Sequence, residues 1–192
     1  MMEQFVQVDT HYTRSINIER DIDSKKILNA YIPTSKALQV LEKVALTFKQ
    51  QDTPRAWSLV GPYGSGKSSF AIFLTHLLED QELETSVLAE NLLTEHNPAL
   101  AQTITEYTHD SNAYCTVLLT GSSESLSKRL LQAMHQAAQK YWLEKSGRKP
   151  KVIEALADAA QSGATVSEII SLVNHLQKAV FKVHGKGVLI IY

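Results

Sequence analysis

The sequence predicts an α/β fold with a mostly parallel sheet, and three observations support this fold class. Short apolar runs that adjoin glycine occur at residues 56–60 (AWSLV) and 188–192 (VLIIY). A third apolar run, residues 114–120, lies between them. Segments whose apolar residues recur at helical spacing separate these runs. Buried apolar strands that alternate with helices are typical of parallel sheets.

The first elements are predicted as an arm and a helix. Residues 1–33 form the N-terminal arm, in which residues 15–18 alternate between polar and apolar side chains as in a small strand. A helix begins near Thr34 or Ser35, either of which can cap its N-terminus. Its apolar residues recur at helical spacing as far as Phe48. The buried strand at 56–60 follows this helix.

The elements after this strand include a helix predicted from Lys67 to Leu78, because five apolar residues there form one face. Residues 86–93 fit either a strand or a helix. Residues 114–120 are the second predicted strand. Together with the final apolar run, these elements place residues 34–192 in one nucleotide-binding domain, on the motif described below.

A helical insertion is predicted over residues 122–183, between the second strand and the last apolar run. Leu126 is the first apolar residue of a long amphipathic helix in this insertion. Residues 152–161 predict a second helix. Thr165 and Glu168 have the spacing of a capping box, which predicts the start of a third helix.

Composition excludes several classes of function. The chain has 192 residues, 44% of them hydrophobic, and 19 basic against 20 acidic side chains give a net charge of −1. No global field attracts nucleic acid or an anionic membrane, and the basic cluster of Lys145, Arg148, Lys149 and Lys151 supports nucleic-acid binding only weakly. The single Cys115 lies in an apolar setting and is expected to be buried. Without a signal peptide or membrane-spanning run, we expect a cytoplasmic protein.

The most informative motif is GPYGSGKS, residues 61–68, which matches the pattern G-x-x-x-x-G-K-[ST] in full. It follows a predicted strand and precedes a predicted helix. Glycines let successive backbone N–H groups turn inward, and the start of the helix adds its own N–H groups and positive dipole end. These features together predict a phosphate site. The candidate binding residues are Gly61, Pro62, Tyr63, Gly64, Ser65, Gly66, Lys67, Ser68 and Ser69.

This motif resembles the Walker A loop of P-loop nucleoside triphosphatases. The resemblance is strongest to the N-terminal part of AAA+ and STAND-like ATPases, including large multidomain ATPases of prokaryotes. It implies a three-layer sandwich, with Lys67 as a catalytic residue on the β and γ phosphates and the Ser68 hydroxyl as a ligand of Mg²⁺. Ser69 is a weaker alternative. The absence of a guanine-reading N-K-x-D tetrapeptide favours ATP.

The segment before the first long helix also fits this resemblance. Tyr31, Ile32 and Pro33 occupy the place where AAA+ and STAND-like ATPases cover the adenine. A hydrophobic staple at the start of a helix explains the same residues equally well.

A catalytic acid is the missing feature. The resemblance implies an acidic residue after a second apolar strand, and residues 188–192 resemble that strand, but the sequence ends there without the acid. Glu90, which follows the apolar run SVLA, is the alternative candidate for this acid. We therefore expect a domain that is incomplete at its C-terminus, truncated after the strand at 188–192, with further domains or subunits of the same ATPase as partners.

Three functions remain open from the sequence. The first is an ATP-binding domain whose hydrolysis occurs only in a longer chain. The second is a small-molecule kinase with the same phosphate loop. The third is a module that binds nucleotide without hydrolysing it. In kinases the strand before the loop pairs directly with the acid-bearing strand, whereas in AAA+ proteins another strand lies between them.

Overall fold

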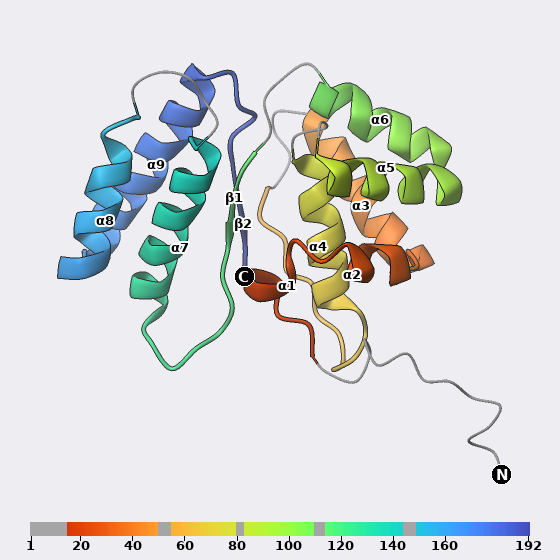
Figure 1. The fold of residues 1–192 in the computed structure, drawn as a ribbon, viewed down its shortest axis with the longest axis horizontal. Helices are drawn as coiled ribbons and strands as arrows, with labels where there is room; N and C mark the ends of the chain where they lie inside the picture. Colours follow the sequence, from red (N-terminus) through yellow and green to blue (C-terminus); the bar gives the residue numbers. More distant parts are fainter. Residues whose placement is uncertain (1–14, 50–54, 80–82, 110–113, 144–148) are drawn as a thin grey trace, which may run out of the picture.

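The computed structural model describes residues 15–49, 55–79, 83–109, 114–143 and 149–192, and it divides their helices into two groups (Figure 1). The first group holds α1 (Ile18–Asp21), α2 (Lys25–Ala30), α3 (Ser35–Lys49), α4 (Lys67–Leu78), α5 (Glu84–His96) and α6 (Pro98–His109). The second holds α7 (Leu126–Tyr141), α8 (Val152–Ser162) and α9 (Val166–Lys182). Strands β1 (Cys115–Leu118) and β2 (Val188–Ile191) run between the two groups.

The two strands form a parallel pair in which Cys115 is opposite Val188 and Leu118 is opposite Ile191. Side chains alternate between the two faces of a strand. Cys115 and Val188 therefore pack with the second helix group, whereas Leu118 and Ile191 pack with the first. The short sheet thus contributes to two hydrophobic cores, one on each face.

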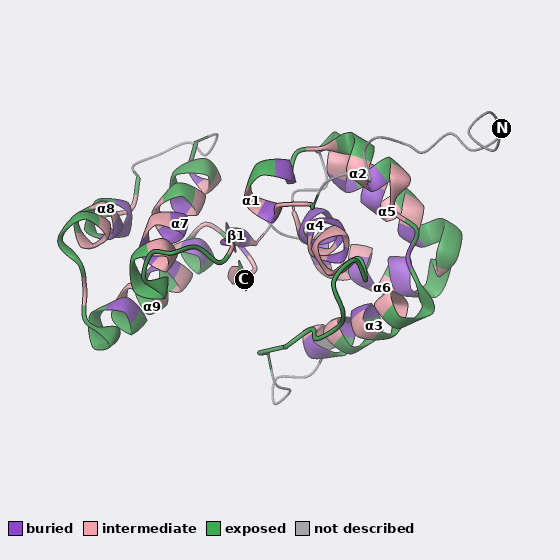
Figure 2. Ribbon diagram, turned by 90° about the horizontal axis from the view of Figure 1, so that it is seen from below, coloured by how far each residue is buried: buried purple, intermediate pink, exposed green. Residues whose placement is uncertain are grey.

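The core of the first group is centred on α4. Phe73 and Ile72 are fully buried there, in contact with helices that surround α4 on several sides (Figure 2). His76 of the same helix is buried too, with Nδ1 2.8 Å from Glu79 Oε2 and Nε2 2.7 Å from the carbonyl oxygen of Ile22. The contact with Ile22 joins the end of α4 to the end of α1, whereas the contact with Glu79 is within the end of α4.

The core of the second group lies between α7, α8 and α9, where Met134, Leu156 and Leu176 are fully buried. The capping box predicted at the start of α9 is confirmed, because the Thr165 side chain accepts from the Glu168 N–H and the Glu168 carboxylate accepts from the Thr165 N–H. Cys115 is buried against this core as expected, and burial raises the pKa of its thiol to about 12. None of the described helices combines the length and the apolar character that crossing a bilayer requires.

The predicted fold class is wrong. Of the described residues, 65% are in helices and 5% in strands, with a two-stranded sheet in place of the mostly parallel sheet of a three-layer P-loop sandwich. The predicted strand at 56–60 has no regular structure and its side chains are exposed. A strand needs a neighbouring backbone for its hydrogen bonds, and within the described ranges β1 and β2 pair only with each other.

The structure corrects one local expectation and decides another. Residues 15–18, predicted as an arm or a small strand, lead into α1, because the Asn17 side chain accepts a hydrogen bond from the Arg20 N–H and caps the helix. Residues 86–93, which fitted a strand or a helix, lie in α5. The predicted strands at 114–120 and 188–192 are confirmed as β1 and β2, although each is only four residues long.

Candidate functional site

The glycine-rich segment forms an exposed loop that leads directly into α4. Residues 61–66 are exposed, and α4 begins at Lys67 as predicted. Gly64 and Gly66 have φ angles of 77° and 79°, in the left-handed region that a residue with a side chain rarely adopts. A Cβ atom added at Gly61 would lie 3.0 Å from the Ser65 Oγ. The backbone conformation and close packing of the loop therefore explain its three glycines.

The start of α4 presents unpaired backbone donors. Gly66 is its N-cap residue and no side chain caps the helix. The N–H of Phe70 donates to the carbonyl oxygen of Gly66 at 2.9 Å, in the first bond of the helix. The N–H groups of Lys67, Ser68 and Ser69 precede that donor and have no acceptor within the helix. They lie at the positive end of the helix dipole, where an anion is favoured.

The side chain of Lys67 lies across the loop. Its Nζ donates to the carbonyl oxygens of Gly61 at 2.9 Å and Pro62 at 2.7 Å, and to the Ser65 Oγ at 3.3 Å. The ammonium group is therefore held at the loop by neutral acceptors and not by a carboxylate. An incoming phosphate can replace these neutral acceptors with anionic oxygens, so that the ammonium gains ion pairs as well as hydrogen bonds.

A cavity of about 550 Å³ joins this loop to the segment between α2 and α3. Of the predicted site residues, it is lined by Gly61, Pro62, Ser65, Gly66, Lys67 and Ser69, and by Tyr31 and Ile32. Tyr63, Gly64 and Ser68 are not among its lining residues. The structure thus brings the predicted phosphate loop and the predicted base-covering segment to one cavity.

Within that segment, Tyr31 is packed inward and Ile32 is exposed. The Tyr31 ring lies 5.0 Å from the Phe73 ring between centroids, and burial raises the pKa of its hydroxyl to about 12. Ile32 is 73% exposed, and Pro33 is buried. Phe73 lies on α4, so its contact with Tyr31 is packing between elements and not a staple within α3. The position of both Tyr31 and Ile32 on the cavity fits the role of a base cover.

Positive charge dominates the cavity. Lys26 of α2, Lys36 of α3 and Lys67 line it, and none of its described lining residues is acidic. Sequence reasoning missed Lys26 and Lys36. The one available signal was their position, a few residues before and after the Tyr31–Pro33 segment, and a lysine at such a position is ordinarily a solvated surface residue.

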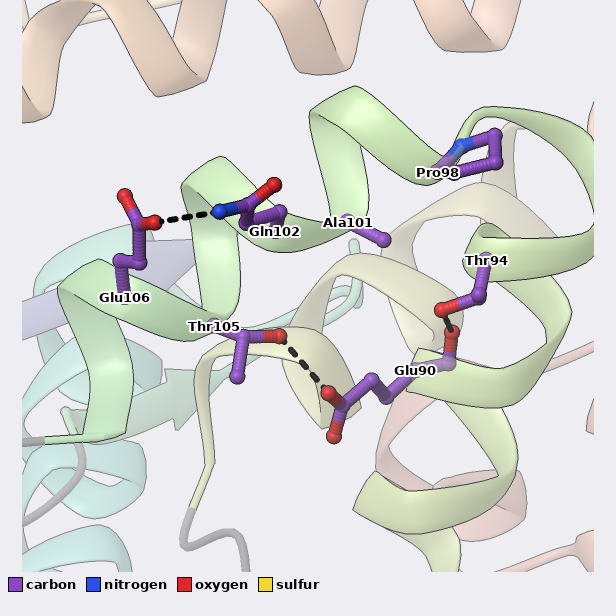
Figure 3. Close-up of a pocket in the computed structure, with 7 residues that line it drawn as sticks. All are labelled: Glu90, Thr94, Pro98, Ala101, Gln102, Thr105 and Glu106. Atoms are coloured by element: carbon purple, nitrogen blue, oxygen red, sulfur yellow. Dashed lines mark hydrogen bonds between the residues drawn. The ribbon is translucent and has the colours of Figure 1, made fainter.

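Glu90, the alternative candidate for the catalytic acid, does not line the cavity at the glycine-rich loop. Residue 90 lies in α5 and not at the end of a strand. Its carboxylate accepts a hydrogen bond of 2.8 Å from the Thr105 hydroxyl, in a groove between α5 and α6 (Figure 3). The prediction that Glu90 is the acid after a second strand is therefore wrong.

A polar cluster at the carboxyl end of β1 joins the two helix groups. Glu19 of α1 accepts hydrogen bonds from the N–H of Thr120 at 2.5 Å and from its hydroxyl at 2.7 Å. Both carboxylate oxygens of Glu19 also lie 2.7 Å from the Arg129 Nη2. The described residues contain no group of three or more histidine, cysteine, aspartate or glutamate side chains that could hold a metal ion.

Only part of the predicted basic cluster lies within the described residues. Lys145 and Arg148 lie outside the described residues, whereas Lys149 and Lys151 are exposed just before α8. No interaction with nucleic acid follows from these positions.

Comparison with known proteins gave no match to a protein-family model, to a curated protein or to a solved structure. The functional interpretation therefore depends on the loop, the start of α4 and the cavity.

Proposed function

We propose that the chain binds Mg²⁺ and a nucleoside triphosphate, ATP in preference to GTP, at the loop formed by residues 61–69. The observation that supports this proposal is that the unpaired N–H groups at the start of α4, the Lys67 ammonium and the apolar segment at Tyr31 meet at one cavity. A triphosphate matches the first two features, and a purine base matches the third.

The residues present fit such a ligand. The N–H groups of Gly66 to Ser69 would bind phosphate oxygens, and Lys67 would exchange its bonds to the Gly61 and Pro62 carbonyls for bonds to the β and γ phosphates. The Ser68 hydroxyl is the proposed ligand of Mg²⁺, although Ser68 is not among the residues that line the cavity. Mg²⁺ takes few protein ligands and completes its octahedral shell with phosphate oxygens and water. When bound, Mg²⁺ neutralises charge on the phosphates and supports their transfer.

Binding is better supported than hydrolysis. Hydrolysis needs a carboxylate that positions the attacking water, and the described residues that line the cavity include none. We propose that the isolated chain binds ATP with negligible turnover, and that turnover in an AAA+ or STAND-like ATPase uses an acid from a further domain or subunit. A cytoplasmic location, in which ATP and Mg²⁺ are abundant, is part of the same proposal.

Isothermal titration calorimetry with Mg·ATP and Mg·GTP tests the site. Lys67→Ala removes charge-assisted hydrogen bonds to two phosphates, at about 1.5–3 kcal/mol each, so ATP affinity is expected to fall by at least about 100-fold. Lys43→Ala, which removes an exposed lysine of α3 outside the cavity, is the matched control and is expected to bind like the wild type. Equal affinities of Lys67→Ala and the wild type would overturn the site.

Two activity assays separate the alternatives. Phosphate release from ATP by the wild-type chain is expected to stay at the background rate. Rapid release that Lys67→Ala abolishes would show that this chain hydrolyses ATP by itself. Transfer of phosphate to a nucleoside or sugar in a metabolite screen would favour the kinase interpretation.

A further inference from the structure

Two of the three lysines on the cavity lie away from the phosphate loop. Lys26 is on α2 and Lys36 is in the first turn of α3, and these helices are joined by the segment that contains Tyr31 and Ile32. The two lysines therefore flank the predicted base-covering segment, whereas Lys67 belongs to the loop. One cavity has cationic groups at two different parts of its wall.

Within the part of the chain that the structure describes, these two lysines also have no internal counter-charge. Lys25, the neighbour of Lys26, forms an ion pair with Glu84. The ion pairs among the described residues include neither Lys26 nor Lys36, and no acidic side chain lines the cavity near them. Like charges that share one cavity repel each other, and a bound anion relieves that repulsion.

In the proposed binding mode, the 5′-phosphates lie at the start of α4 and at Lys67, and the base lies at Tyr31 and Ile32. Lys26 and Lys36 flank the base-covering segment, so we assign an anion at these lysines to the nucleoside end of the ligand. The ribose hydroxyls are the positions at which a nucleotide carries a second phosphate.

We propose that the preferred ligand of this cavity is a nucleotide with a 2′- or 3′-phosphate in addition to its 5′-phosphates, and that Lys26 and Lys36 bind this second phosphate. The inference depends on the proposed function, because it places the 5′-phosphates at the loop. It adds a substrate class that the phosphate loop does not specify.

The test compares matched ligands by calorimetry on the full chain. Adenosine 5′-monophosphate is titrated beside adenosine 3′,5′-bisphosphate and adenosine 2′,5′-bisphosphate, with the wild type, with Lys26→Met/Lys36→Met and with the control Lys43→Met. In the wild type, one bisphosphate is expected to bind about tenfold more tightly than the monophosphate. The double variant is expected to lose this gain and Lys43→Met to keep it.

The outcomes distinguish the two proposals. If neither bisphosphate binds more tightly than the monophosphate in the wild type, or if the double variant keeps the gain, the second phosphate site is wrong even where Mg·ATP binds normally. If Mg·ATP does not bind at all, the proposed function fails first. Lys26 and Lys36 are both exposed, so the double variant is expected to fold, and urea unfolding checks this.

Discussion

The carboxylate of Glu19 connects the two groups of helices, and removing its charge is expected to destabilise the fold. Glu19 is on α1, whereas its partner Thr120 follows β1 and its partner Arg129 is on α7. Partial burial raises the pKa of Glu19, but the hydrogen bonds from Arg129 and Thr120 and the charge of Arg129 together outweigh burial and hold the pKa below its usual range. The ionised form is therefore favoured in the folded state.

The size of the expected loss in the free energy of unfolding follows from these contacts and from the partial exposure of the two charged side chains. The side chains of Glu19 and Arg129 are 28% and 23% exposed. Glu19→Gln replaces one acceptor oxygen with an NH₂ group, and it leaves Arg129, whose buried Nε has no hydrogen-bond partner, without its counter-charge. Hydrogen bonds to charged groups contribute about 1.5–3 kcal/mol and exposed ion pairs about 0–1 kcal/mol, so we expect a loss of about 1–2 kcal/mol in the free energy of unfolding.

The pH dependence has a definite sign. Because the folded-state pKa of Glu19 is lowered, its contribution is fully present above the ordinary glutamate pKa of about 4.3 and is lost as the pH falls through the folded-state value. The difference between the wild type and Glu19→Gln should therefore be constant from pH 7 to about pH 5 and decrease below about pH 4.

Urea unfolding followed by circular dichroism measures these differences. Glu84→Gln is the matched control, since Glu84 also pairs with a basic residue far away in sequence, Lys25, but is 70% exposed. Its loss in the free energy of unfolding is expected to stay below about 0.5 kcal/mol. A double-mutant cycle with Arg129→Met should give a coupling of about 1 kcal/mol. Equal losses for Glu19→Gln and Glu84→Gln would refute the reasoning.

Two further predictions concern stability. Burial lowers the pKa of His76, but Glu79 and a backbone carbonyl outweigh this effect and raise it, so its contribution is full below the ordinary histidine pKa of about 6.5 and is lost as the pH rises through the folded-state value. Urea midpoints measured from pH 5.5 to 9 should therefore fall more steeply in the wild type than in Glu79→Gln, and parallel curves would contradict this. Gly185→Ala would place a Cβ atom against the Tyr141 hydroxyl and should cost about 1–3 kcal/mol in the free energy of unfolding. Gly121→Ala, whose nearest contact is 3.6 Å away, should unfold near the wild-type midpoint, and equal shifts for the two variants would exclude steric overlap as the cause.

Sequence reasoning succeeded where structure depends on neighbours along the chain. The helix from Lys67 to Leu78 and the capping box at Thr165 and Glu168 are both set by contacts within a few residues. The strand at 56–60 failed because its formation depends on a distant segment for hydrogen bonds. Apolar composition identifies a segment that favours burial, but it contains no information on whether a partner strand is adjacent.

The same difference between local and distant contacts applies to the candidate site. The loop residues were found from one short motif, and Tyr31 and Ile32 were found from a resemblance to ATPases that cover the adenine. Lys26 and Lys36 were missed because their place on the cavity depends on how α2 and α3 pack beside the loop. No pattern along the chain distinguishes them from surface lysines such as Lys43.

The loop can form the proposed anion site although the expected sheet is absent. The proposed anion site consists of backbone N–H groups, which are positioned by two left-handed glycines and by the first turn of α4. Phe70, buried directly after that turn, fixes the start of α4 to the first core. The helix side therefore holds the site in place, and the exposed segment at 56–60 contributes mainly to the cavity wall through Leu59 and Val60. For this reason, the absence of the predicted sheet is compatible with a well-formed glycine-rich loop at the start of α4.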